Sequence, residues 1–207
     1  MAPTPDLQKI ERKVYASKFK DGLIDIQLGL MLIGGGIIST ISSREHLSTA
    51  TALLILVLFF FIVGLIPFLG KKWITNPRMG TVRLGLARKK RMRMAGWALG
   101  IMVLVQAVLI LLQFTGTVRP DFSRLQGATM AGLIFFIPLV AMAYFNDYTR
   151  GYLHAILVGG SVTAIISFNS WIPLLIAGSI ALVVGIVVFT VFLRDYPLPE
   201  EGTGNGQ

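Results

Sequence analysis

Asp25 is the residue whose type and position promise the most chemistry in this sequence. An apolar run begins at Gly22, so this carboxylate falls about one turn inside a segment that hydropathy predicts to cross a membrane. A charged side chain at the centre of a membrane helix costs about 2.5 to 3.5 kcal/mol to insert, and less near the interface. In one interpretation Asp25 faces an internal cavity and binds a cation or relays a proton. In the other it lies at headgroup depth, wetted or paired with Lys18, Lys20 or Arg150, and only fixes helix packing.

His154 is the predicted partner of Asp25. Each of the two residues lies three positions after a glycine at the start of an apolar run, and both predicted spans run in the same direction. The sequence therefore allows a pair between two spans at nearly the same depth in the membrane. Gln27 is the third candidate for this polar site, and Gln106 and Gln113 are lesser ones. The alternative is that His154 serves helix packing or the membrane interface, as a lone histidine at a helix entrance often does.

Other chemistry lacks the residues that it needs. The chain has no cysteine and two histidines, and His46 falls in a loop predicted on the opposite side of the membrane from His154. The sequence contains no HExxH motif, carboxylate cluster or phosphate-binding glycine loop. It therefore predicts no metal, no cofactor and no enzymatic activity. A membrane-embedded enzyme ranks third, behind a transport or sensing role and an interaction role.

Hydropathy predicts the elements that position these residues. Of the 207 residues, 54% are hydrophobic and 14% are charged, whereas soluble domains average about 45 to 50% and about 25%. The apolar residues gather in runs of about 20, the length of helix that crosses roughly 30 Å of hydrocarbon. The sequence therefore predicts an all-α integral membrane protein, a compact bundle of about six transmembrane helices at residues 22–42, 49–69, 95–114, 128–145, 148–168 and 171–193.

Polar segments are predicted on both sides of this transmembrane domain, which covers residues 22–196. Leu7, Ile10 and Val14 recur at helical spacing among charges, so residues 1–21 are predicted to form an amphipathic helix on the membrane surface. Residues 197–207 are rich in Pro, Gly and Glu, which predicts a disordered tail. The connections after the first, fourth and fifth spans are very short, so those neighbouring helices should be antiparallel and adjacent.

The basic residues predict the orientation of the bundle. Placing the N-terminus in the cytoplasm leaves only Arg44, Arg119 and Arg124 outside among the 19 Lys and Arg residues. This distribution follows the positive-inside rule. With an even number of spans, both termini then face the cytoplasm, and the predicted location is the plasma (inner) membrane.

The basic loop at residues 70–94 carries a structural prediction of its own. Residues 73–75 and 81–84 are strand-prone, and residues 76–80, with Pro77 and Gly80, supply the turn between them. A small cytoplasmic β-hairpin is therefore predicted. The positive-inside rule explains the charge without any nucleic acid, and the loop suits anionic lipid headgroups or a cytoplasmic partner. The predicted docking residues are Arg78, Arg88, Lys89, Lys90, Arg91 and Arg93.

Two strings of this sequence carry a resemblance to known proteins. They are Lys-Asp-Gly-Leu-Ile-Asp at residues 20–25 and Trp-Ile-Thr-Asn-Pro-Arg-Met-Gly-Thr-Val-Arg at residues 73–83. The chain resembles a family of uncharacterised prokaryotic membrane proteins that pair a DGLxD-type first-span entrance with an ITxPRxGxV-type cytoplasmic segment. The resemblance covers about the first 95 residues. It implies a bacterial or archaeal plasma membrane and the same topology, and it implies no activity.

Glycines within the predicted spans indicate close helix packing, because a missing side chain lets two helix backbones approach in lipid. In the first span these are Gly29, Gly34, Gly35 and Gly36, and in the fifth span Gly159 and Gly160. A flexible hinge at residues 34–36 is the alternative.

The function predicted from these patterns is conduction or sensing of an ion, a proton or a small solute through an intramembrane polar site of Asp25, His154 and Gln27. The alternative is a non-catalytic interaction or scaffold protein that docks a cytoplasmic partner or anionic lipid through its basic loop. Both functions require the lipid bilayer as a partner, and both are compatible with a homo-oligomer.

Overall fold

The computed structural model describes residues 19–44, 48–79 and 123–197, together with scattered helical positions between 90 and 108. Every regular element in these residues is helical, which confirms the all-α part of the predicted fold class. The elements are α2 (Leu23–Arg44), α3 (Thr49–Gly70), a π-helical turn (Lys71–Thr75), α4 (Asn76–Met79), α6 (Arg124–Asn146), α7 (Arg150–Phe168) and α8 (Ile172–Asp195). The predicted amphipathic helix at residues 1–21 and the tail at 197–207 lie almost entirely outside the described residues.

Five helices in the described part of the chain are long and apolar enough to cross a membrane: Leu23–Ser42, Ala50–Met79, Arg124–Asn146, Arg150–Phe168 and Ile172–Asp195. They match the first, second, fourth, fifth and sixth predicted spans. The third predicted span, residues 95–114, falls mostly outside the described residues, although its described positions are helical. The count of six therefore stays a prediction.

The predicted β-hairpin is wrong over the half that the structure describes. Residues 73–75 belong to the π-helical turn and residues 76–79 to α4, so the path of α3 continues as helix up to Met79. Pro77 explains the wider turn, because its ring would clash with the carbonyl group four residues earlier in a regular α-helix. Thr75 Oγ1 also donates a hydrogen bond to Asp21, two residues before the start of α2, and this bond holds the π-helical turn against the bundle. The other half of the predicted hairpin, residues 80–84, lies outside the described residues.

Short polar signals set the ends of the helices. A capping box starts α6, in which Ser123 Oγ accepts from the Gln126 N–H and Gln126 Oε1 accepts from the Ser123 N–H. Ser48 caps α3 with a single bond of this kind, in which its Oγ accepts from the Thr51 N–H. Asp147 and Asn169, which end α6 and α7, adopt the left-handed conformation with φ of 53° and 50°. These tight links let α6, α7 and α8 pack as consecutive neighbours.

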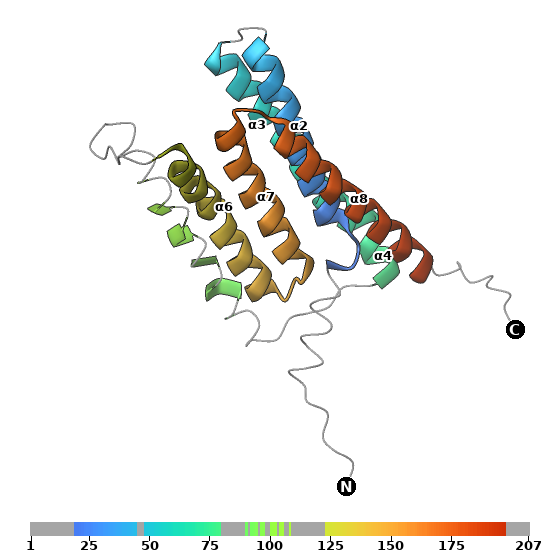
Figure 1. Cartoon of the computed structure of the whole chain (residues 1–207). Helices are drawn as coiled ribbons and strands as arrows, with labels where there is room; N and C mark the ends of the chain where they lie inside the picture. Colours follow the sequence, from blue (N-terminus) through green and yellow to red (C-terminus); the bar gives the residue numbers. More distant parts are fainter. Residues whose placement is uncertain are drawn as a thin grey trace, which may run out of the picture.

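Two helix pairs dominate the packing, namely α2 with α8 and α6 with α7, while α7 joins the pairs through α8 and α3 packs on α2 (Figure 1). Glycines make the closest approaches. A Cβ at Gly29 would lie 2.5 Å from the Leu182 N of α8, and one at Gly159 would lie 2.8 Å from Phe136 Cβ. The predicted packing role is confirmed at these two positions. At Gly160 no atom of the described residues lies within 4 Å of an added Cβ, so the packing role stays a prediction there.

The outer faces of these helices are apolar. Leu54, Phe61, Val183 and other large hydrophobic side chains are at least 60% exposed. Contiguous apolar surface on this scale is rare in soluble monomers and fits contact with lipid. In contrast, α2 and α7 begin, and α6 and α8 end, at one end of the bundle (Figure 1). We call this end, which carries Asp21, Asp25 and Arg150, the polar end.

Candidate functional site

Asp25 is buried at the polar end and has three partners from the start of α7 and the link before it. Its side chain is 1% exposed. Oδ1 accepts a hydrogen bond from the Tyr148 hydroxyl and contacts His154 Nε2, and Oδ2 lies 2.5 Å from Arg150 Nη1. The structure thus brings together the Asp25 and His154 that the sequence predicted as a pair. Arg150, the partner that the packing interpretation allowed, is present as well.

Tyr148 completes this network, and its residue type alone gave no signal for it. Its hydroxyl lies 2.8 Å from His154 Nε2, and its ring stacks on Phe19 with 4.8 Å between centroids. Burial raises the pKa of the Tyr148 phenol, and the Asp25 carboxylate that accepts its hydrogen raises it further. The phenol therefore keeps its proton at neutral pH and acts as a donor to Asp25. We call Asp25, Tyr148, Arg150 and His154 the polar cluster.

Arg150 also connects α7 to the backbone just before α2. Arg150 Nη2 donates to the backbone carbonyl of Phe19, and the Arg150 guanidinium also lies 5.6 Å from the centroid of the Tyr148 ring. Outside the polar cluster, α2 and α7 make few contacts, since α2 packs mainly on α8. The polar cluster joins the first turns of these two helices, and further along Leu32 of α2 and Val158 of α7 belong to one apolar core cluster.

Asp21 is a second buried carboxylate, 0% exposed, that sequence reasoning left out of the site. Its Oδ2 accepts from Thr75 Oγ1 at 2.9 Å and its Oδ1 accepts from the Leu23 N–H at 3.3 Å. Burial raises the pKa of Asp21, although Lys71 opposes this shift. Asp21 precedes the apolar run, so it resembles a solvated loop residue in the sequence. The nearest signal was its place in the DGLxD-type string.

The raised pKa of Asp21 predicts a pH dependence of stability. Because the folded-state pKa lies above the ordinary 3.8, the protonated form favours folding, and this contribution fades as the pH rises through the folded-state pKa. Asp21→Asn removes the titration, so the wild type should lose stability relative to this variant as the pH rises from about 4. Thermal unfolding of both proteins across this range measures the difference. Asp195→Asn, at a side chain 52% exposed, is the control. A wild type that gains on Asp21→Asn with rising pH would contradict the prediction.

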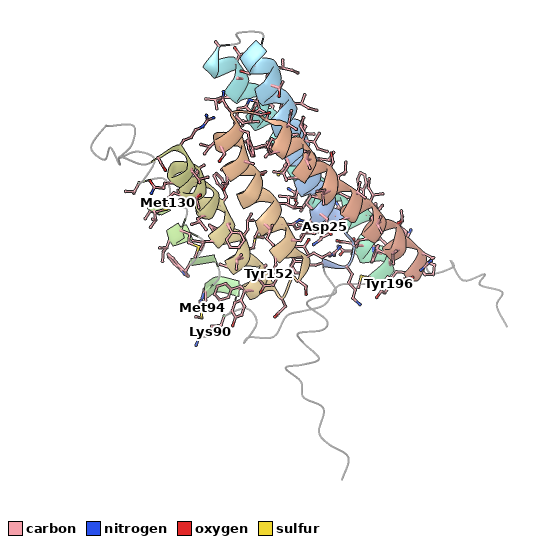
Figure 2. All side chains as sticks on the ribbon, viewed as in Figure 1. Asp25, Lys90, Met94, Met130, Tyr152 and Tyr196 are labelled. Carbon is pink, nitrogen blue, oxygen red and sulfur yellow. The ribbon has the colours of Figure 1, made fainter. Side chains whose placement is uncertain are left out.

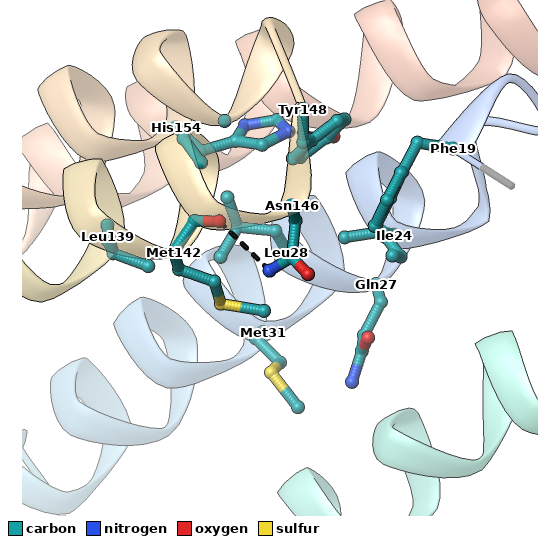
Figure 3. Close-up of a pocket in the computed structure, with 12 residues that line it drawn as sticks. Phe19, Ile24, Gln27, Leu28, Met31, Leu139, Met142, Asn146, Tyr148 and His154 are labelled. Carbon is teal, nitrogen blue, oxygen red and sulfur yellow. Dashed lines mark hydrogen bonds between the residues drawn. The ribbon is translucent and has the colours of Figure 1, made fainter. Parts of the chain in front are cut away.

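A cavity of about 160 Å³ adjoins the polar cluster between α2 and the α6–α7 pair (Figure 3). Gln27, the third predicted site residue, lines it but makes no contact with Asp25 among the interactions of the described residues. Its side chain extends away from His154 in Figure 3. Asn146 lies on the wall as well, with its Nδ2 donating to the Met142 carbonyl at 2.9 Å. The lesser candidates Gln106 and Gln113 lie outside the described residues.

The predicted docking residues are spread over different environments. Arg78 Nη1 donates to the Tyr196 carbonyl at 2.7 Å, so this side chain ties α4 to the end of α8. Lys90 and Arg93 are exposed. Arg88, Lys89 and Arg91 lie outside the described residues. No group of three His, Asp, Glu or Cys side chains that could hold a metal ion occurs in the part of the chain that the structure describes.

Comparison with known proteins returned no match to a family model, a curated protein or a solved structure. The resemblance carried by residues 20–25 and 73–83 therefore stays a prediction. The functional argument rests on the polar cluster and the cavity beside it.

Proposed function

We propose that this chain is a small multi-pass membrane transporter or sensor, without enzymatic activity, whose polar cluster takes up and releases a proton. The observation that carries the proposal is the burial of Asp25, 1% exposed, against His154, whose side chain is 4% exposed. A carboxylate, an imidazole and a phenol in mutual contact form a chain of groups that exchange protons. Ionisable groups at such positions of membrane proteins commonly serve proton or ion pathways.

Arg150 supplies a route from protonation to a change in conformation. While Asp25 is an anion, it attracts the guanidinium that also holds the Phe19 carbonyl. A proton on Asp25 removes that attraction and leaves Arg150, 25% exposed, to turn toward water. Protonation would loosen α2 from α7 at the polar end, while the apolar cluster that holds Leu32 and Val158 keeps the two helices together further along. This coupling is what a proton-driven transporter or a pH sensor requires.

The distribution of charge supports an orientation with the polar end in the cytoplasm. Lys71, Lys72, Arg78, Arg150 and Arg194 all lie at or beyond the helix ends that meet there. An excess of Lys and Arg marks the cytoplasmic side of bacterial inner-membrane proteins. Protons would then exchange between the polar cluster and the cytoplasm.

Proton flux in liposomes tests the proposal. Purified protein is reconstituted, a pH gradient is applied, and dissipation is followed with an internal pH dye for the wild type, His154→Gln and Tyr148→Phe. We expect flux in the wild type that is lost in His154→Gln and strongly reduced in Tyr148→Phe. Tyr152→Phe, which makes the same change at a side chain 40% exposed, should keep wild-type flux.

The result that would overturn the proposal is an absence of proton flux, with and without a solute gradient, in proteins that are all folded by circular dichroism. A folded double variant, Asp25→Asn with Arg150→Gln, tests separately whether Asp25 is the proton site. It removes both charges together, so it leaves no unpaired charge in the bundle. Wild-type flux in this variant would equally exclude Asp25 as the proton site.

A role in docking is the second candidate, favoured by the exposure of Lys72 and of Trp73, which is 69% exposed, beyond the end of α3. Basic and aromatic side chains at this level suit an anionic lipid surface. Removing residues 76–80 would break the Arg78 to Tyr196 bond, so it is a poor test. Lys72→Gln with Lys90→Gln and Arg93→Gln is a better one. If docking is the function, this variant should lose binding to vesicles that contain phosphatidylglycerol, and Asp25 variants that fold should keep it.

A further inference from the structure

We propose that Phe19 is a lid over the polar cluster, and that Arg150 holds this lid shut while Asp25 carries its negative charge. The inference rests on the proposed function, since it names the residue that would control exchange of protons between the cluster and the cytoplasm. Its test measures how readily a reagent in water reaches the cluster and does not need flux.

Three aromatic rings form a row at the polar end. The ring of Phe19 stacks on that of Tyr148 with 4.8 Å between centroids, and the Tyr148 ring lies 5.7 Å from that of His154 (Figure 3). Exposure falls along this row, since Phe19 is partly exposed, Tyr148 is 8% exposed and His154 is 3% exposed. Asp25, which Figure 2 labels, is 1% exposed. Phe19 is therefore the outermost ring of the row, and it covers the face of Tyr148 on which it stacks.

Arg150 joins the lid to the charge of Asp25. Its Nη1 lies 2.5 Å from Asp25 Oδ2, and its Nη2 donates to the Phe19 carbonyl. A guanidinium is a planar fork that serves two acceptors at once, and here one acceptor is the proton site and the other is the backbone of the lid. While Asp25 is an anion, it fixes the guanidinium in the position that holds Phe19. A proton on Asp25 ends that attraction, so Arg150 turns toward water and the Phe19 carbonyl loses this donor.

The chain that follows the lid is anchored elsewhere. Asp21 accepts from Thr75 Oγ1, and Gly22, with φ of 68°, lies so close to α8 that an added Cβ would be 2.6 Å from the Gly185 carbonyl oxygen. Loss of the Arg150 bond therefore frees Phe19 while residues 21 and 22 keep their own contacts.

Phe19 also has room to move. Protein interiors are close-packed, so a ring leaves its place readily only where free space adjoins it. Phe19 lines the cavity of about 160 Å³ beside the polar cluster, which supplies that space. The charged and titratable groups that the described residues bring to the lid and the cluster are Asp21, Asp25, Lys71, Tyr148, Arg150 and His154. Lys71 Nζ lies 5.4 Å from the Phe19 ring centroid, and α8 presents Gly185 and Phe189 at this level.

Modification of His154 by diethyl pyrocarbonate measures how often the lid opens. This small electrophile transfers an ethoxycarbonyl group to a nitrogen of a neutral imidazole, and mass spectrometry of the peptides follows the product. His154 Nδ1 is buried and Nε2 contacts Asp25, so the reaction reports an open state of the cluster. The full chain is studied in detergent micelles at neutral pH, in a His46→Gln background that leaves His154 as the one histidine of the sequence.

We expect Phe19→Ala to raise the rate of modification about tenfold, close to the largest factor that one aromatic pair is worth. Phe19→Tyr keeps the stacked ring and should react at the wild-type rate. Phe59→Ala is the matched control, because Phe59 is also partly exposed, contacts the Phe60 ring and packs on Gly34 of α2. It should leave the rate unchanged. Phe19→Leu, which fills much of the space but cannot stack, takes the place of a Phe19→Ala variant that does not fold.

Arg150→Lys tests the hold on the lid. It keeps a positive charge opposite Asp25, but its compact ammonium cannot occupy both Nη positions, so it should raise the rate as well. A wild-type rate in Arg150→Lys would exclude this role of Arg150. Equal rates in Phe19→Ala and the wild type, or an equal increase in Phe19→Ala and Phe59→Ala, would overturn the lid. Flux in the wild type without faster modification of Phe19→Ala refutes this inference alone, and faster modification without flux refutes the proposed function alone.

Discussion

Asp25→Asn is expected to lower the free energy of unfolding by about 3 to 5 kcal/mol, the usual cost of removing one partner from a buried ion pair. The variant leaves Arg150 and His154 facing an amide at a position that is 1% exposed. The asparagine can still accept from Tyr148, so the loss comes from the charge and not from the shape. Denaturant unfolding in mixed micelles, followed by circular dichroism, measures the change.

Two further variants show whether the ion pair is the cause. Asp195→Asn makes the same substitution where Arg194 lies 3.6 Å away on the surface, and it should change stability by less than about 1 kcal/mol. Asp25→Asn combined with Arg150→Gln should recover most of the loss, since a neutral pair needs no compensation. A single Asp25→Asn variant as stable as the wild type would mean that water reaches the carboxylate at headgroup depth.

Gly29→Val and Gly185→Val are each expected to destabilise the protein by at least about 1 to 3 kcal/mol, the range that overpacking commonly costs. A Cβ at Gly29 would lie 2.5 Å from Leu182 N, and one at Gly185 would lie 2.6 Å from Ile26 N. Both clashes are with backbone, so no side chain can rotate away. The two helices must separate, and α2 would then move relative to α7 as well. Unfolding of the purified variants in the same micelles measures the loss.

Gly160→Val and Gly64→Val are matched controls, because no atom in the described part of the chain lies within 4 Å of an added Cβ at either position. Both glycines lie within membrane-spanning helices, so the propensity change is comparable to that at Gly29 and Gly185. The controls should stay within about 1 kcal/mol of the wild type, as substitutions away from packed sites usually do. If Gly29→Val were as stable as Gly160→Val, α2 and α8 would not be in close contact in the membrane.

Hydropathy predicts the spans well because crossing hydrocarbon constrains each helix by itself. It fixes the length and ends of a span and the approximate depth of a residue such as Asp25. It also indicates which spans run in the same direction, which is enough to pair Asp25 with His154. It contains nothing about the rotation of each helix about its axis. That rotation is set by close contacts such as Gly29 against Leu182, which require the tertiary structure.

The features that the sequence did not predict also depend on tertiary contacts. Tyr148 lies in a link between helices, and its role depends on the left-handed turn at Asp147 that swings its ring toward α2. Asp21 depends on a partner 54 residues away, Thr75. The β-hairpin was predicted from the strand propensity of residues 73–75 and from the turn residues after them. The end of a long helix overrode this weak local preference, as tertiary context often does.

The continuation of α3 through the π-helical turn has a mechanical consequence. The helical path Ala50–Met79 holds 30 residues, which at 1.5 Å per residue is about 45 Å, against a hydrocarbon layer of about 30 Å. A helix this long tilts or projects from the bilayer, and by how much depends on the thickness of the membrane. Thr75 near its far end holds Asp21, four residues before Asp25. A change in bilayer thickness that tilted α3 would therefore move Thr75 and, through Asp21, shift the first turn of α2.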